Sequence, residues 1–130
     1  MILDSSAVVA ILRAEPEARV MAELISLTPA CAISAVNYVE AAIVIDSSRD
    51  PIASRRFDDF FRESEIVVEP VTVRQAEIAR EAYRDFGKGR HRGGLNFGDC
   101  FAYALAKEKG ETLLFKGHDF RRTDIEAAEA

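Results

Sequence analysis

Short apolar runs alternate with longer amphipathic segments along the whole chain. The apolar runs span residues 1–3, 30–33, 66–68 and 112–115, and polar, proline or glycine residues bound them. Runs of this length are typical of buried strands, whereas apolar residues at helical spacing fill the segments between them. The alternation predicts an α/β fold, with a central and mainly parallel sheet of about four to five short strands and helices on both faces.

Residues that begin or end helices lie between these runs. The expected helix starts are Ser34, Asp50 with Pro51, Thr72 with Gln75 as a capping box, and Asn96. Gly87 and Gly110 are expected to end the last two helices. Two groups of apolar residues at helical spacing are expected to face the core: Val20, Met21, Leu24 and Ile25, and Ala76, Ala79, Tyr83 and Phe86. A third group is expected to lie either in the core or in a dimer contact: Phe57, Phe60 and Phe61.

Length and composition favour a single domain over residues 1–130. With 130 residues, 48% of them hydrophobic and 30% charged, the chain can bury a core without disulfides. Cys31 and Cys100 lie in apolar contexts without a second thiol or a histidine at metal-ligand spacing, so both are expected to be reduced core residues. The sequence shows no leader and no apolar run of membrane-spanning length, and we therefore expect a cytoplasmic protein without membrane contact.

Four acidic residues stand out, and three of them lie at strand ends or helix starts on what should be one edge of a parallel sheet. Asp4 follows the first strand and Asp119 the fourth, Asp99 lies in the first turn of a helix, and Glu40 lies among aliphatic residues inside a helix. Carboxylates that meet repel one another unless a cation joins them, and such oxygen ligands suit Mg²⁺ or Mn²⁺ rather than zinc. Metal ions held in this way can activate water for phosphodiester hydrolysis, which predicts a hydrolase of nucleic acid.

Each acid also has a purely structural interpretation. Asp4 or Ser5 can cap the following helix, Asp99 can complement a helix dipole, and Asp119 can form a turn. Glu40 is harder to explain in this way, because a lone carboxylate among bulky aliphatic side chains is unfavourable. The joint placement of the four acids therefore favours a metal site over four separate structural roles.

Basic residues are clustered, although the formal net charge is -5. Total charge does not locate charge, so an acidic metal pocket and local basic patches can occur in one chain. A glycine-rich basic loop precedes the helix of Asp99, and it can either contact a nucleic-acid backbone or remain solvated. The candidate residues for binding a nucleic-acid backbone are Lys88, Arg90 and Arg92 in this loop, and Lys116, for which the alternative is that it covers the sheet edge.

Four motifs together resemble the PIN-domain ribonucleases, and more narrowly the VapC toxins of bacterial toxin-antitoxin pairs. They cover essentially the whole chain in the family order: Asp4-Ser5-Ser6-Ala7; Ser34-x-x-Asn37-x-x-Glu40; Asn96-Phe97-Gly98-Asp99 with Ala102 and Tyr103; and Leu113 to Phe120 with Thr123-Asp124. The resemblance implies a small PIN fold, Mg²⁺- or Mn²⁺-dependent endoribonuclease activity on tRNA or another structured RNA, a homodimer, and inhibition by a cognate VapB-type antitoxin.

The resemblance also assigns site residues by their positions in the motifs. His118 departs from the family pattern, because many relatives carry an acid or an asparagine before the final acid. A site for a hard cation does not call for histidine, so His118 is expected to stand outside the ligand set. The assigned residues are Asp4, Glu40, Asp99 and Asp119 as acidic ligands, Ser6 as the hydroxyl beside the first of them, and Asn37 and Asn96 as supporting residues.

Two further function classes are alternatives to a nuclease. A phosphoacceptor receiver module also has an α/β sheet, a magnesium pocket and a lysine after a late strand, here Lys116. It needs a phosphoacceptor after a central strand, and the run at 66–68 is followed only by Glu69 and Pro70. The other alternative is a PIN-like scaffold that binds RNA or protein without cleaving, but such a scaffold has no need of four mutually repelling acids.

Overall fold

The four strands form one parallel sheet with the order β3-β2-β1-β4. The computed structural model describes residues 1–89, 91 and 94–129. Ile2 pairs with Ala32 on one side and with Leu113 on the other, so β1 is a central strand. The α/β fold class predicted from the apolar runs is confirmed. The strands are β1 (Ile2–Leu3), β2 (Ala32–Ser34), β3 (Val67–Glu69) and β4 (Leu113–Leu114).

The helices begin at the residues that the sequence marks as caps. Ser34 accepts a hydrogen bond from the N–H of Val36 at 3.3 Å, and Asp50 accepts one from Ile52 at 2.9 Å. These bonds satisfy backbone donors that a helix start leaves without partners. The helices are α1 (Ser5–Leu12), α2 (Ala18–Leu27), α3 (Ala35–Asp46), α4 (Pro51–Ser64), α5 (Val73–Phe86), α6 (Phe97–Lys109) and the short 3₁₀ helix η1 (Asp119–Arg122).

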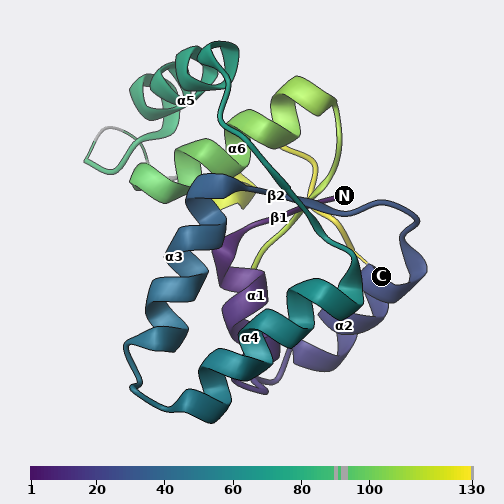
Figure 1. The fold of residues 1–130 in the computed structure, drawn as a ribbon. Coiled ribbons are helices and arrows are strands. Elements are labelled where there is room, and N and C mark those ends of the chain that lie inside the picture. The colour runs from purple at the N-terminus through teal and green to yellow at the C-terminus, as the bar shows by residue number, and fades with distance from the viewer. Residues whose placement is uncertain (90, 92–93, 130) are drawn as a thin grey trace.

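Helices cover both faces of the sheet, as Figure 1 shows, with α5 and α6 on one face and α1, α2 and α4 on the other. Buried residues accordingly form two core clusters, one that includes Leu105 and Phe120, and one that includes Val8, Met21 and Phe57. Cys31 and Cys100 are both free and buried, as expected. In the described part of the chain, no helix has the length and apolar character needed to cross a membrane.

Several apolar positions differ from the expected core. Val20 is 49% exposed, because it precedes the buried Met21 by one residue and so lies about 100° away around α2. Tyr83 is also exposed. Phe57, by contrast, is a core residue, because it is buried at 3% exposure against Tyr38, and so does not support a dimer contact.

The expected capping box at the start of α5 forms only in part. The hydroxyl of Thr72 accepts a hydrogen bond from the N–H of Gln75 at 3.1 Å. The side chain of Gln75 instead donates to Glu108 on α6 at 2.9 Å. A buried amide with a partner on the neighbouring helix replaces the predicted reciprocal bond, and it links α5 to α6.

Candidate active site

The carboxyl edge of the sheet gathers the polar residues that the sequence motifs contain. Asp4 follows β1, and its backbone N–H donates to the carbonyl of Leu114 on β4 at 2.9 Å. Ser34 ends β2 and begins α3, which carries Glu40. Open parallel sheets place their ligand sites at this edge, because strand ends and helix starts converge there.

Asp4 is almost completely buried and has one oxygen without a protein partner. Its Oδ2 accepts hydrogen bonds from the backbone N–H of Ser6 at 3.0 Å and from the Ser6 hydroxyl at 2.5 Å. Its Oδ1 is buried and accepts no hydrogen bond from the described residues. Burial raises the pKa of Asp4, and the nearby charge of Glu40 raises it further. Asp4 thus caps α1 and in addition presents an unused oxygen that can bind a cation.

Glu40 is held by side chains from two other positions of the motifs. Its Oε1 accepts hydrogen bonds from the amide of Asn37 at 2.8 Å and from the hydroxyl of Ser5 at 3.2 Å. The sequence predicts Ser5 as a possible helix cap, but Asp4 has the capping role in the structure, and Ser5 instead orients Glu40. Its contact with Glu40 depends on how α1 packs against α3, which no local signal in the sequence reveals.

Asn37 joins α3 to the start of α6. Its side chain is fully buried, and its amide donates to the carbonyl of Gly98 at 2.9 Å as well as to Glu40. A Cβ atom added at Gly98 would lie 1.9 Å from Oε2 of Glu40, so the Glu40 carboxylate occupies the space that a side chain at position 98 would need. Gly98 is therefore needed for space at this position, not for an unusual backbone conformation.

Asp99 forms a reciprocal capping box with Asn96. The side chain of Asn96 accepts from the N–H of Asp99 at 2.9 Å, and Asp99 accepts from the N–H of Asn96 at 3.0 Å. Burial raises the pKa of Asp99 to about 7, and the charges of Asp4, Asp119 and then Glu40 add to this effect. Asp99 thus lies within electrostatic range of the other three acids that the sequence predicts.

The raised pKa of Asp99 predicts a pH dependence of stability in metal-free protein. Native Asp99 keeps its proton up to about pH 7, whereas the unfolded chain releases it near 3.8, so the native state binds more protons between these values. The free energy of unfolding should therefore fall as pH rises through this window, by up to about 1.4 kcal/mol per pH unit from this group. Thermal unfolding in EDTA should show this fall, and Asp99→Asn should reduce it. An equal slope in the variant would contradict the assignment.

The segment after β4 carries Asp119, and it also directs Lys116 away from the acids. The backbone N–H of Lys116 donates to the hydroxyl of Ser6 at 3.0 Å, which ties this segment to Asp4. The ammonium group of Lys116 instead pairs with Glu15 and, at 3.4 Å, with Glu17. This arrangement favours the interpretation that Lys116 covers the sheet edge.

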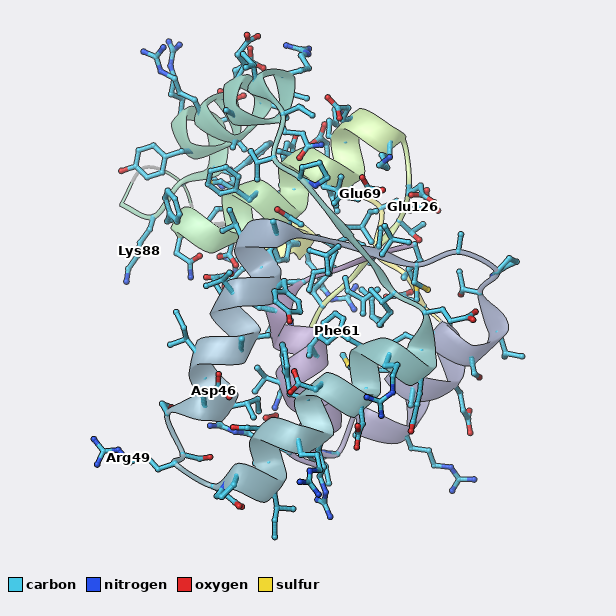
Figure 2. The ribbon with its side chains drawn as sticks, viewed as in Figure 1. Asp46, Arg49, Phe61, Glu69, Lys88 and Glu126 are labelled. Atoms are coloured by element: carbon cyan, nitrogen blue, oxygen red, sulfur yellow. The ribbon has the colours of Figure 1, made fainter. Side chains whose placement is uncertain are left out.

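The basic loop is described only in part. Lys88 is exposed, and Figure 2 shows its side chain extending away from the body of the protein. Arg90 and Arg92 lie outside the described residues. The RNA contacts of this loop therefore stay a prediction.

Comparisons with known proteins agree with the fold and the motifs. The PIN domain model matches residues 1–126. The chain is 51% identical to ribonuclease VapC28 of Mycobacterium tuberculosis over 129 residues, which cover 98% of this chain and 97% of that protein. It is 46% identical to a ribonuclease VapC of Mycolicibacterium smegmatis over 127 residues, with 98% of each chain covered.

Solved structures share the same fold at low sequence identity. VapC20 of Mycobacterium tuberculosis, described as a sarcin-ricin loop cleaving toxin, aligns with a TM-score of 0.77 and 17% identity over 99% of this chain and 98% of its own. FitAcB of Neisseria gonorrhoeae aligns with a TM-score of 0.69 and 20% identity over 97% and 94% of the two chains. With the family model matching nearly the whole chain and close relatives matching end to end, the chain belongs to the PIN-domain family, among the VapC ribonucleases.

Proposed function

We propose that this protein is a Mg²⁺- or Mn²⁺-dependent endoribonuclease and the toxin of a toxin-antitoxin pair. The observation that carries the proposal is the buried Oδ1 of Asp4, which accepts no hydrogen bond from the described residues although three further acids lie near this site. An ionised carboxylate in such a place is unfavourable unless a cation or a proton compensates it. The names of the close relatives, which are ribonucleases, point to RNA as the substrate.

The donor atoms fit a hard divalent cation. In the residues that the structure describes, no three His, Cys, Asp or Glu side chains are arranged to hold a metal ion by themselves. Mg²⁺ commonly binds through only one or two carboxylates and keeps several water molecules as further ligands. A site with two carboxylates is therefore sufficient for this ion. Asp4 and Asp99 would hold the ion, with Glu40 and Asp119 adding negative charge around it.

The residues around the acids have separate tasks in hydrolysis. When bound, the cation would supply an activated water and stabilise charge on the phosphate. Ser6 orients Asp4 through two hydrogen bonds, Asn96 fixes Asp99, and Asn37 holds Glu40. The reaction adds water across a P–O bond and yields one phosphate-bearing end and one hydroxyl end.

A structured RNA, such as tRNA, is the proposed substrate. Support comes from VapC20, which has the same fold and is described as cleaving the sarcin-ricin loop, a part of a structured RNA. The exposed Lys88 lies on the loop before the α6 helix of Asp99, where it can contact the RNA backbone. Such contacts make the affinity fall with salt.

A VapB-type antitoxin and a second copy of the chain are the proposed protein partners. Structural neighbours from Klebsiella pneumoniae and Rickettsia felis are toxin-antitoxin assemblies, which supports an antitoxin here. For the second copy, Phe97 is 73% exposed beside Tyr83 and Phe101 in an apolar surface between α5 and α6. Exposed apolar surface of this kind is typical of protein contacts.

The match to the PIN family argues against a phosphoacceptor receiver module. The remaining alternative is a PIN-like scaffold that binds RNA or protein without cleaving. The buried Asp4 and Asp99 count against a silent scaffold, because buried carboxylates without a ligand destabilise a fold.

Metal removal provides the direct test of the nuclease. Purified protein should cut structured RNA in Mg²⁺ or Mn²⁺, lose this activity in EDTA, and regain it when excess metal is restored, because the acids need the cation to act on phosphate. The rate of product formation on a labelled RNA measures this. Cutting that persists in EDTA after repurification would contradict the mechanism, and no cutting with either metal would favour the silent scaffold.

A further inference from the structure

A cavity of about 640 Å³ is lined in part by Lys116, Gly117 and His118, the residues directly before Asp119, and has no role in the hydrolysis described above. Its walls come from α2, the end of β4, the segment before Asp119 and the C-terminal segment. Ala128 and Glu129 line it together with residues of α2, so segments far apart in the sequence border it. Its size is within the range of cavities that bind small molecules or parts of larger ligands.

The floor of the cavity is apolar and aromatic. Val20 and Met21 of α2 line it together with Leu114 and Phe115. The guanidinium carbon of Arg121 lies 5.5 Å from the centre of the Phe115 ring. Because Phe115 is only 8% exposed beneath Arg121, the exposed guanidinium is the flat surface that an occupant can reach, and flat heterocycles such as nucleobases stack well on guanidinium planes.

The charges around the cavity are already compensated within the protein. Lys116 pairs with Glu15 and Glu17, and Nη1 of Arg121 lies 2.9 Å from Glu129. A phosphate group would have to compete with these carboxylates, whereas a neutral base would not. The compensation therefore favours an uncharged, planar occupant.

His118 is the polar residue of the rim that the nuclease site leaves without a task. Its imidazole is exposed, and it makes no hydrogen bond or ion pair with any residue that the structure describes. It directly precedes Asp119, while the neighbouring Lys116 N–H bonds the Ser6 hydroxyl that holds Asp4. A base seated against His118 would thus belong to a nucleotide close to the phosphate at the acids.

We propose that this cavity binds an unpaired nucleobase of the substrate RNA beside the scissile phosphate, with His118 and Arg121 as the residues that select it. The inference rests on the proposed ribonuclease function and adds the source of its sequence preference. Proteins that read RNA sequence commonly do so on single-stranded bases that leave the helical stack.

Filling the cavity tests the inference. Val20→Trp places a large ring over the floor from a half-exposed position, and Leu27→Trp is the matched control, because Leu27 is 81% exposed on the same helix and does not line the cavity. The substrates are RNA oligonucleotides that differ in one base near the cut, and one that lacks a base there. We expect Val20→Trp to lower kcat/KM for the preferred base about tenfold, to leave the abasic RNA unchanged, and so to flatten the preference.

His118→Ala offers a second variant that does not alter the floor. It should reduce the ratio of kcat/KM between preferred and disfavoured bases, while Leu27→Trp keeps the preference of the unsubstituted protein. Equal base preference in all variants would overturn the inference. The inference would also be overturned if Val20→Trp lowered kcat/KM equally on normal and abasic RNA, or if it weakened only the binding of a protein partner.

A binding measurement separates this inference from the nuclease itself. In EDTA, RNA with 2-aminopurine at the tested position should lose fluorescence on binding to the unsubstituted protein and to Leu27→Trp, because the base stacks in the cavity. Val20→Trp should abolish most of this loss. If no metal supports cleavage and this pattern still appears, the nuclease proposal fails and the base site stands; no fluorescence change in any protein would overturn the base site.

Discussion

Asp4→Asn is expected to reduce RNA cleavage about a thousandfold or more while leaving the metal-free fold at least as stable. A carboxylate that holds a catalytic cation stabilises the transition state by several kcal/mol, and each 1.36 kcal/mol of activation free energy changes the rate about tenfold. Asparagine keeps the size of the side chain and an oxygen for the two Ser6 donors. It also removes a buried charge that Glu40 repels. Single-turnover cleavage and thermal unfolding in EDTA measure the two effects.

Asp50→Asn is the matched control for this variant. Asp50 caps α4 by accepting from the N–H of Ile52, two residues on, just as Asp4 accepts from Ser6. Asparagine caps helices as well as aspartate does, so this control should change neither cleavage nor stability. If Asp4→Asn cleaved RNA as fast as Asp50→Asn, Asp4 would be only a helix cap. A large drop in the melting temperature of Asp4→Asn would likewise support capping.

Gly98→Ala is expected to lower cleavage about a hundredfold with little loss of stability. The added Cβ would lie 1.9 Å from Glu40 Oε2, so the carboxylate at the end of this flexible side chain must move away. Misplacing a catalytic group by about 1 Å can reduce the rate about a hundredfold. The backbone itself should tolerate the change, because alanine is favoured over glycine inside a helix by about 1 kcal/mol. Gly98→Ala should therefore lower the cleavage rate strongly and change the melting temperature little.

A double-mutant cycle with Glu40→Ala shows whether the effect passes through Glu40. Removing the Glu40 carboxylate alone removes the clash, so adding Gly98→Ala to that variant should cause no further loss of activity. If the two substitutions instead reduced the cleavage rate by independent factors that multiply in the double variant, Gly98 would act in another way, for example on the start of α6. A melting temperature far below that of the unsubstituted protein would contradict the displacement of a single side chain.

Local signals in the sequence were sufficient to predict the order of strands and helices. Ser34, Asp50 and Asn96 each begin a helix with the expected hydrogen bond, because capping depends on residues only two or three positions apart. The convergence of Asp4 and Asp99 also followed, since parallel strands carry their ends to one edge. The family resemblance was confirmed by the comparisons.

Features that depend on packing between distant elements could not be predicted. Ser5 donates a hydrogen bond to Glu40 only because α1 lies against α3, and Gly98 faces Glu40 only because α6 also lies against α3. The side of α2 that faces solvent was also ambiguous, because Val20 and Met21 are both apolar neighbours. Lys116 could not be placed for the same reason, since its partners Glu15 and Glu17 lie far away in sequence.

The cavity and the acids are built from largely separate parts of the chain. Asp4 follows β1, Glu40 lies on α3 and Asp99 on α6, whereas α2 and the C-terminal segment supply much of the cavity wall. Of the four acids, Asp119, which begins η1, shares its segment with the cavity. Substitutions on α2 can therefore reshape the cavity without disturbing the residues that orient Asp4 and Glu40. Within a genome that carries many paralogues of one nuclease, this separation would let duplicated copies diverge in the RNA they recognise while their chemistry stays fixed.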